Sequence, residues 1–380
     1  MPADHILIVN SEYPPIGGGA GNASANLARH LAQLGRRVTV LTARFADLPH
    51  DEQAGNVRVV RLPALRSKQD RSNTLEQISF LLSAALLGLP WVLRLRPQAV
   101  IAFFGAPSGV AVWFWSLFLS LPYIVSLRGG DVPGFRPYDF ARQHRLLAPL
   151  LRLVWRRARA VVANSAGLRD LGAAFESKVP IATIPNGVDV EQFQAPQREW
   201  QTARLLFVGR VVFQKGLDVL LDALGGLVEY EWVLTIVGDG PRRAELEPQA
   251  QQLGIAERIT FAGWQSGAEL AAAYAEANLF AYASRHEGMP NALLEAMASG
   301  LPAVATRIAG NEELVVEGET GLLVPSEDPA ALRAALTKLI NDPALRQRYG
   351  EAARKRVQTR YSWHNVASQY ADLLDQATAD

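Results

Sequence analysis

The regular alternation of short apolar runs with helical patterns is the feature that most constrains this chain. Apolar runs typical of strands recur at 6–10, 37–42, 57–62, 99–104, 123–127, 160–164 and 181–184, and again at 204–208, 232–237, 258–261, 279–282 and 303–306. Strands that alternate with helices form parallel βαβ units. We therefore predict an α/β fold with two doubly wound, Rossmann-like sheets, one in each half of the chain.

A turn signal and a polar stretch separate the two halves. Pro185-Asn186-Gly187 is typical of a turn, and residues 192–201 are polar and contain Pro196. This predicts a first domain at 1–190 and a second at 200–360. Ligands of open α/β sheets bind beyond the carboxyl ends of the strands. The two domains are therefore expected to face a cleft, and residues that directly follow strands are candidates for the site.

The absence of cysteine removes several function classes. A chain without cysteine has no disulfide scaffold, thiolate metal site, iron–sulfur cluster or cysteine nucleophile. Its start has no basic segment and only a short apolar run, so we predict a first strand in place of a signal peptide and a cytoplasmic location. The apolar stretch 78–95 is interrupted by Pro90 and flanked by Arg94 and Arg96, which favours a buried helix over a membrane span.

Charge is distributed unevenly along the chain. Residues 1–190 contain 21 Lys and Arg against 12 Asp and Glu, a net +9, whereas residues 191–380 contain 17 against 25, a net −8. The basic half suits an anionic surface or substrate. Its densest part contains Arg142, Arg145, Arg152, Arg156, Arg157 and Arg159 among leucines. Two interpretations stay open, an amphipathic helix on anionic lipid and a solvated helix face; without a reading motif, no nucleic-acid partner is expected.

A glycine-rich loop follows the first strand and opens a helix. The backbone N–H groups of Gly17, Gly18 and Gly19 can approach an anion at the positive end of that helix. A dinucleotide fingerprint does not fit, because Gly17 lies seven residues beyond Asn10 and the second strand ends without a carboxylate. A purely structural turn is the alternative.

Two cations flank a second strand-to-helix loop. Gly209-Arg210 directly follows the run at 204–208, and Lys215-Gly216 precedes the next helix. Both side chains can meet a phosphate as charged donors, each hydrogen bond contributing roughly 1.5–3 kcal/mol. Two solvated surface cations are the alternative.

The strongest cluster is the segment 284–300. Pro290 suits the first turn of a helix and Gly300 its end, so Glu287 is expected in the loop before the helix and Glu295 within it. A fully helical span between the two carboxylates would cover roughly 12 Å, about the reach of a diphosphate from ribose to sugar. Between them, the backbone N–H groups of Gly288, Met289 and Asn291 would face an anion. Two solvated acids are the alternative.

These motifs, with Gly238-Asp239-Gly240-Pro241 and Ile184-Pro185-Asn186-Gly187-Val188-Asp189, resemble the retaining glycosyltransferases of family 4, which have the GT-B fold. The resemblance implies that Arg210 and Lys215 neutralise the donor diphosphate. It also implies that Glu295 holds the ribose hydroxyls and that Glu287, with the backbone at 288–289, holds the donor sugar. The donor-binding set it implies is Gly209, Gly238, Gly288, Met289, Asn291 and Glu295. Acceptors bind in the first domain of that family, where Gly17–Gly19 would close on the phosphate or acceptor, and the tail 362–380 would pack back onto that domain.

One departure concerns the strand at 123–127. Many relatives carry a histidine after this strand, whereas this chain has Arg128-Gly129-Gly130-Asp131. A guanidinium stays protonated near neutral pH, so Arg128 cannot act as a base. Asp131 is therefore a candidate for touching the sugar or orienting the acceptor, with capping of its own loop as the alternative.

The expected reaction is sugar transfer from a nucleoside-diphosphate sugar, without metal or other cofactor, to a glycan, polysaccharide or lipid-linked acceptor. No Asp-x-Asp motif is present, and fixed cations can stabilise the departing diphosphate. The resemblance implies retention of configuration, with the leaving phosphate taking the acceptor's proton. A nucleotide-sugar epimerase and a non-catalytic nucleotide-sugar binding protein are the alternatives. The basic half, Trp91 and the aromatic run 113–115 further predict peripheral contact with anionic membrane, for which core packing of the aromatics is the alternative.

Overall fold

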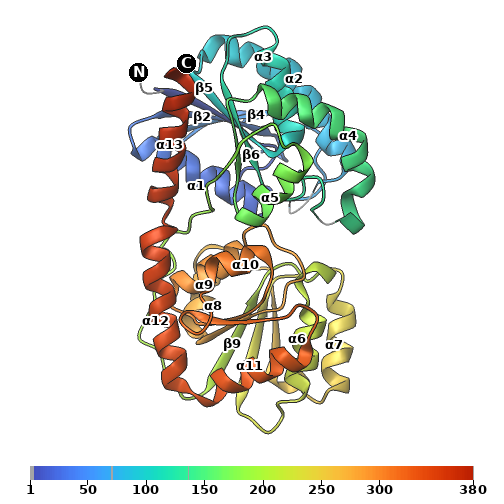
Figure 1. The fold of residues 1–380 in the computed structure, drawn as a ribbon, viewed down its shortest axis with the longest axis vertical. Coiled ribbons are helices and arrows are strands. Elements are labelled where there is room, and N and C mark those ends of the chain that lie inside the picture. Colours follow the sequence, from blue (N-terminus) through green and yellow to red (C-terminus); the bar gives the residue numbers. More distant parts are fainter. Residues whose placement is uncertain (1–3, 70–71, 136, 380) are drawn as a thin grey trace. The chain divides into compact units, whose positions relative to one another are not determined.

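The computed structural model describes residues 4–69, 72–135 and 137–379, with the backbone alone at 137–140. The chain divides into two compact units, residues 1–187 with 363–380 and residues 188–362 (Figure 1). Each unit contains its own largely parallel sheet covered by helices. This arrangement confirms the predicted fold class. The chain first passes from one unit to the other between Gly187 and Val188, directly after the turn signal Pro185-Asn186-Gly187.

The sheet of the first unit has eight strands in the order β3-β4-β2-β1-β5-β6-β7-β8. The strands are β1 (His5–Val9), β2 (Arg37–Ala43), β3 (Asp51–Ala54), β4 (Val57–Leu62), β5 (Ala99–Phe103), β6 (Tyr123–Leu127), β7 (Ala160–Ala163) and β8 (Ile181–Thr183). Every neighbouring pair is parallel except β3–β4, an antiparallel hairpin at the edge. Strand β3 was not predicted, because its sequence, Asp-Glu-Gln-Ala, is polar and largely exposed.

Helices cover both faces of this sheet. They are α1 (Gly19–Gln33), α2 (Thr74–Leu95), η1 (Phe104–Ser108), α3 (Gly109–Ser116), α4 (Pro137–Arg157), α5 (Ala166–Phe175) and α13 (Trp363–Ala379). One core cluster joins the sheet to α1 and α13, and a second joins its other face to α2, α3, α4 and α5. Helix α1 ends just before Gly35, which adopts the left-handed region with φ 86°.

The expectation of a buried helix at 78–95 is wrong. Helix α2 begins at Thr74 with a capping box between Asn73 and Glu76, and only one of its faces packs against the core. Phe80, Ala84 and Val92 are buried, whereas a row of leucines on the opposite face is exposed. The apolar run concealed this asymmetry, because both faces of the helix are hydrophobic.

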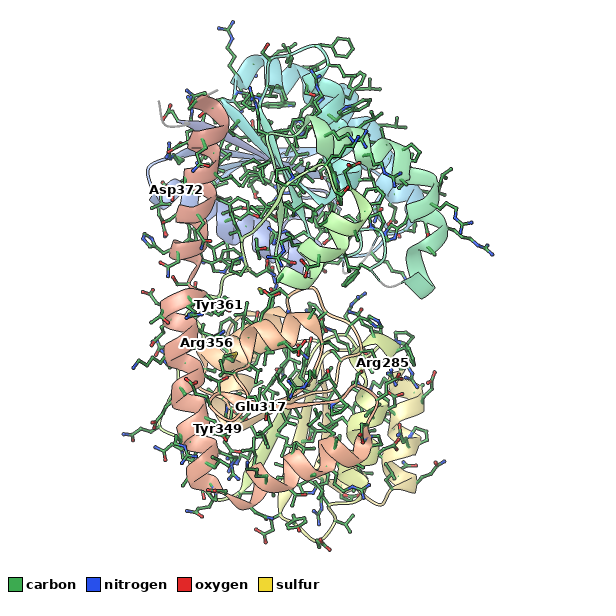
Figure 2. The ribbon with its side chains drawn as sticks, viewed as in Figure 1. Arg285, Glu317, Tyr349, Arg356, Tyr361 and Asp372 are labelled. Atoms are coloured by element: carbon green, nitrogen blue, oxygen red, sulfur yellow. The ribbon has the colours of Figure 1, made fainter. Side chains whose placement is uncertain are left out.

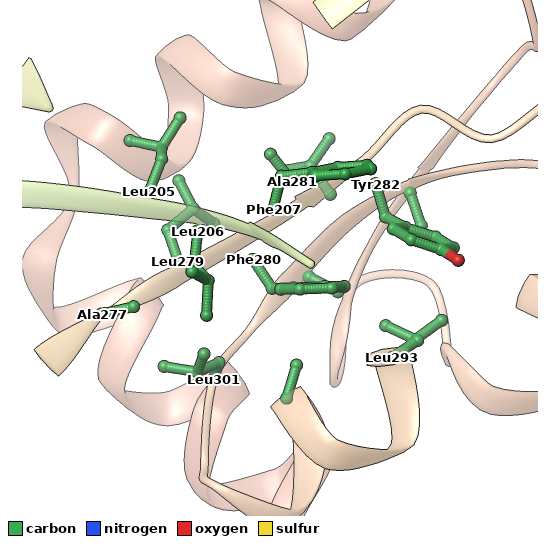
Figure 3. Packing of buried hydrophobic residues seen from close by; sticks show 14 of the residues in the cluster. Leu205, Leu206, Phe207, Ala277, Leu279, Phe280, Ala281, Tyr282, Leu293 and Leu301 are labelled. Atoms are coloured by element: carbon green, nitrogen blue, oxygen red, sulfur yellow. The ribbon is translucent and has the colours of Figure 1, made fainter. Parts of the chain in front are cut away.

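The sheet of the second unit has six strands, all parallel, in the order β11-β10-β9-β12-β13-β14. They are β9 (Ala203–Val208), β10 (Trp232–Val237), β11 (Ile259–Gly263), β12 (Leu279–Tyr282), β13 (Ala303–Thr306) and β14 (Gly321–Val324). Only the short β14 was not predicted. The core includes leucines of β9 and β12 with stacked Phe280 and Tyr282, whose ring centroids lie 5.4 Å apart (Figure 3).

Helices surround this second core. They are η2 (Phe213–Lys215), α6 (Leu217–Gly225), α7 (Arg243–Gln252), η3 (Ala256–Arg258), α8 (Gly267–Glu276), α9 (Asn291–Ala298), α10 (Ala309–Leu314), α11 (Pro329–Asn341) and α12 (Pro343–Arg360). The two segments that enter and leave the unit lie side by side, since the N–H of Val188 donates to the carbonyl of Tyr361 at 2.8 Å.

Candidate functional site

The order of the strands defines one special position in the second sheet. From β9 the chain adds β10 and β11 on one side, and then β12, β13 and β14 on the other. The reversal lies between β9 and β12, which are hydrogen-bonded neighbours. Loops at such a switch point diverge at the carboxyl ends of the strands and leave room for a ligand. Lys215 follows β9 and Glu287 follows β12, so the topology brings together two residues that are 72 positions apart.

Lys215, Tyr282 and Glu287 form a compact polar cluster at this point. The Lys215 Nζ lies 2.7 Å from Glu287 Oε1 and 2.6 Å from the Tyr282 hydroxyl. The same hydroxyl lies 2.8 Å from Glu287 Oε1. The Lys215 and Glu287 side chains are 14% and 9% exposed, so the ion pair is largely shielded from water. Figure 3 shows the Tyr282 hydroxyl directed away from the apolar cluster that holds its ring.

A network around Arg285 holds the two loops that carry this cluster. The Arg285 guanidinium, labelled in Figure 2, donates to the carbonyl of Phe213 at 2.6 Å and pairs with Asp218 at 3.0 Å and Glu327 at 2.9 Å. Its backbone N–H donates to the carbonyl of Gln214 at 2.8 Å. These contacts join the turn before α6 to the loop after β12, and thereby fix Lys215 beside Glu287.

Close backbone approach explains the glycine that follows Lys215. Gly216 has φ 63° and ψ 27°, in the left-handed region, and caps the turn η2 before α6. A Cβ at this position would overlap the carbonyl oxygen of Ala283. Glycine therefore lets the loop after β9 lie directly on the loop after β12.

The other donor-site candidates lie around the same end of the sheet in different environments. Arg210 is exposed, directly after β9, and its side chain has no ion pair within the described part of the chain. Gly209 and Gly238 directly follow the neighbouring strands β9 and β10, and a Cβ on Gly238 would overlap the carbonyl of Gly209. Gly288 is buried and Met289 belongs to the hydrophobic core.

The helix after Glu287 is shorter than the fully helical span considered in the sequence. The prediction that Pro290 lies in the first turn is wrong, because Pro290 occupies the N-cap position with extended backbone and α9 begins at Asn291. Glu287 therefore lies in the loop before the helix, and Glu295 lies in its second turn. The predicted end is confirmed, because Gly300 follows with φ 73°.

Glu295 lies in an apolar setting. Its Oε2 accepts a hydrogen bond of 2.9 Å from the buried Tyr274 hydroxyl. Burial raises the pKa of Glu295 to about 7, although the Tyr274 hydrogen bond acts in the opposite direction. The carboxyl therefore changes charge near neutral pH.

This raised pKa predicts a pH-dependent stability. A carboxyl whose pKa is raised on folding binds more protons in the folded protein, so it stabilises below its unfolded pKa of about 4.5 and loses that contribution as pH rises through about 7. Relative to Glu295→Gln, the wild type should lose up to about 3 kcal/mol between pH 5 and pH 8. Thermal midpoints of both proteins across this range measure the difference; parallel curves would contradict the assignment.

Asp131 organises its own loop in the first unit. Its Oδ1 accepts from the backbone N–H groups of Arg128 at 3.0 Å and Gly129 at 3.1 Å, and its Oδ2 accepts from that of Gly105 at 2.8 Å. Burial raises the pKa of Asp131, while these donors oppose the rise. The carboxylate thus joins the loop after β6 to the loop after β5, the arrangement anticipated by the capping alternative.

Arg128 connects three segments of the first unit. Its guanidinium lies 4.2 Å from the centre of the Phe103 ring, donates to Asn186 Oδ1 at 2.6 Å and reaches the Tyr370 hydroxyl of α13 at 3.4 Å. Its Nε is buried without a hydrogen-bond partner. No carboxylate forms an ion pair with it among the described residues.

The glycine loop of the first unit follows β1, at the edge of that sheet's own switch point between β1 and β5. Gly17 has φ 92°, and its N–H donates to the carbonyl of Gln69 at 2.8 Å. The N–H of Gly18 lies 3.5 Å from Glu12 Oε2, and α1 begins at Gly19. The loop thus precedes a helix, as predicted. Its backbone is held by the carbonyl of Gln69 and the carboxylate of Glu12.

Sequence reasoning missed Tyr282, Gln214 and Asp218. Tyr282 ends an apolar strand with a hydroxyl at the switch point, which is a usable signal once the strand order is known. Gln214 donates to the carbonyl of His286 at 2.6 Å, and Asp218 holds Arg285. No local sequence pattern around Gln214 or Asp218 indicates these contacts. Within the described residues, no group of three or more His, Asp or Glu side chains lies close enough to hold a metal ion.

Comparison with known proteins identifies relatives over nearly the whole chain. Residues 18–187 match the family described as glycosyl transferase 4-like domain, and residues 189–356 match glycosyl transferases group 1. Glycogen synthase of Mycobacterium tuberculosis is 27% identical over 97% of this chain and 94% of its own length.

Solved structures share the fold. Sucrose-phosphate synthase from Thermosynechococcus elongatus aligns with a TM-score of 0.88 at 23% identity, covering 99% of both chains. Anabaena HepE in complex with UDP-glucose aligns with a TM-score of 0.77 at 20% identity, covering 98% of this chain and 99% of that one. At these identities the structures establish the two-domain GT-B fold.

Proposed function

Because the chain belongs to the family-4 type of glycosyltransferases, we propose that it moves a sugar from a nucleoside-diphosphate sugar to an acceptor hydroxyl with retention of configuration. The observation that supports this proposal best is the Lys215–Tyr282–Glu287 cluster at the switch point of the second sheet. A cation, a hydroxyl and a carboxylate at one point suit a ligand that carries both phosphate and sugar hydroxyls.

The cations act on the leaving group. Departure of a nucleoside diphosphate increases the negative charge on its phosphate, so a fixed cation that holds it more strongly as charge develops lowers the barrier. The Lys215 Nζ is held by the Tyr282 hydroxyl at 2.6 Å and by Glu287 Oε1 at 2.7 Å. The side chain therefore needs little rearrangement during the reaction. Arg210, exposed beside it in the same loop, supplies the second positive charge. With these cations, the proposed reaction needs no metal ion.

The acids position the donor. Glu287 accepts hydrogen bonds from sugar hydroxyls, and Gly288, Met289 and Asn291 contact the donor through their backbone. Glu295 accepts from the ribose, and Gly209 and Gly238 keep the strand ends free of side chains. In this proposal Glu287 does not attack the sugar, because its Oε1 is already held by Lys215 and Tyr282; the departing phosphate takes the acceptor's proton.

The first unit binds the acceptor. Its glycine loop, Gly17, Gly18 and Gly19, and the loop containing Arg128 and Asp131 follow the parallel strands β1 and β6, so they lie at the carboxyl end of the sheet, where ligands of open α/β sheets bind. We propose a glycan, polysaccharide or lipid-linked acceptor. Glycogen synthase and lipopolysaccharide core glycosyltransferases are among the similar proteins.

A donor screen tests the proposal. Thermal midpoints are measured with UDP-, GDP- and ADP-sugars, since a ligand that binds only the native state raises the midpoint. One nucleotide class should stabilise the wild type, with about tenfold weaker binding in Arg210→Ala. Arg348→Ala, which removes an exposed arginine on α12, is the matched control and should bind normally.

Chemistry is tested on the donor that binds. Nucleoside diphosphate should be released only when an acceptor is present. EDTA should not change the rate of this release. Conversion of the donor to an isomer would instead indicate an epimerase, and a glycosyl adduct on Glu287 in mass spectra would overturn the positioning role. Absence of stabilisation by every nucleotide sugar would overturn the proposal itself.

A further inference from the structure

The outer face of α2 is an apolar surface without a partner in its own unit. Leu75, Ile78, Leu82, Leu86 and Leu93, here named the α2 face, follow helical spacing and are 46% to 71% exposed. Among the described helices, α2 is the one long and apolar enough, by length and composition only, to cross a membrane. This row of exposed apolar side chains runs along a helix of 22 residues. Soluble proteins usually expose apolar residues singly and not in a continuous row of this length.

The inner face of α2 is committed to the domain. Phe80, Ala84 and Val92 lie in the core, and the Trp115 Nε1 donates to the carbonyl of Ala85 at 3.0 Å. A Cβ on Gly88 would lie 2.7 Å from the Trp115 ring, so the two helices touch there. Crossing a bilayer would expose this core, whereas lying flat leaves it intact. These contacts also show that Trp115 of the aromatic run is a core residue.

Basic residues outnumber acidic residues around the α2 face. Arg66 and Lys68 precede the helix, and Arg94 and Arg96 end it. The segment 72–169 contains 11 arginines and three acids, of which Glu76 and Asp131 are buried. Helix α4 packs against α3 beside α2 (Figure 1). It adds Arg142 and Arg145, which are exposed. Leucines with arginines around them are the composition of an interfacial helix on anionic lipid.

We propose that the α2 face lies flat in the headgroup region of an anionic lipid bilayer, with Arg94, Arg96, Arg142 and Arg145 on the lipid phosphates. A second copy of this chain is a poorer occupant, because two copies would bring like charges together around the apolar face. Trp91 is not part of this surface, because its ring packs against the core of the unit and contacts His50 and Arg58. This inference is independent of the proposed transfer reaction.

Vesicle flotation of the full chain tests the inference. The protein should float with vesicles of phosphatidylcholine containing about one third phosphatidylglycerol in about 50 mM NaCl. Binding should fall at about 0.5 M NaCl and with pure phosphatidylcholine, since screening weakens the arginine contacts.

Variants separate the two parts of the surface. Leu82→Gln/Leu86→Gln should lower the partition coefficient at least about tenfold, because two leucines no longer leave water. Arg142→Gln/Arg145→Gln should weaken binding to anionic vesicles alone. Val228→Gln/Val233→Gln, at exposed valines of the second unit, is the matched control and should bind as wild type. All three should transfer sugar to a soluble acceptor at the wild-type rate, so loss of membrane binding is distinguishable from loss of function.

Three outcomes would overturn the inference. They are a wild type that stays unbound to anionic vesicles at low salt, leucine variants that bind like the valine control, and a lipid-free dimer in sedimentation velocity that Leu82→Gln/Leu86→Gln abolishes. The last would assign the α2 face to a second copy.

Discussion

Replacing Lys215 by alanine is expected to lower kcat by about 100- to 1,000-fold, the effect of removing one fixed donor from a developing negative charge. The Nζ that contacts Glu287 at 2.7 Å is lost, so the departing diphosphate meets one cation fewer. Release of nucleoside diphosphate at saturating donor measures kcat, and donor titration measures binding separately. If turnover is unchanged, Lys215 has no role on the phosphate.

The ion pair also predicts a cost in stability, which a matched set of variants separates from catalysis. Without Lys215, the 9% exposed Glu287 carboxylate is left without its cation, which costs about 3–5 kcal/mol in buried pairs. The double variant Lys215→Ala/Glu287→Gln should recover much of this stability and none of the rate. Lys338→Ala, at an exposed lysine of α11, should change neither. Recovery of turnover in the double variant would make the pair purely structural.

Substituting Gly216 by alanine is expected to disrupt the site through the backbone. The residue has φ 63°, which costs a non-glycine residue about 1–2 kcal/mol, and its Cβ would overlap the Ala283 carbonyl. The loops after β9 and β12 must then separate, and Lys215 loses its position beside Glu287. We expect a total loss of about 3 kcal/mol in stability and at least a 100-fold lower kcat. Thermal unfolding and nucleotide release measure the two effects.

Gly254 supplies the control for this substitution. It has φ 70°, and nothing lies within 4 Å of the Cβ that alanine would add. Gly254→Ala should therefore lose only the conformational contribution, about 1 kcal/mol, and keep full activity. If the two alanine variants behave alike, the contact between Gly216 and Ala283 does not position the site.

Most strands could be predicted because strands of a parallel sheet, covered on both faces, are rich in apolar residues. The runs at 57–62, 123–127, 232–237, 279–282 and 303–306 correspond to strands with the same bounds. Strand β3 could not be found in this way, since it lies at an edge and its polar residues pair with β4 through the backbone. Helix α2 was misjudged for the opposite reason, because hydrophobicity all around a helix does not reveal which side is covered.

The sequence predicted only some of the residues of the candidate site. Glycines after strands, a cation before a helix and a carboxylate in a Gly-Met-Pro turn are local patterns, and they identified Lys215 and Glu287. Their direct contact was not anticipated, and neither was the hydroxyl of Tyr282 that touches both. In the first unit, Asp131 accepts three backbone hydrogen bonds, one of them from the distant Gly105.

By itself, the sequence determined the fold class, the division into two halves and the residue types available at each strand end, because periodicity and turn residues act over short stretches of chain. The tertiary structure decided which of those residues meet. The strand order of the second unit places β12 beside β9, and this adjacency brings Lys215 within 2.7 Å of Glu287 across 72 positions. In the first unit, the way the helices pack on the sheet leaves one face of α2 uncovered. The first outcome depends on the order of the strands in a sheet, and the second depends on how the helices cover a sheet. No local sequence pattern encodes the strand order or the helix packing.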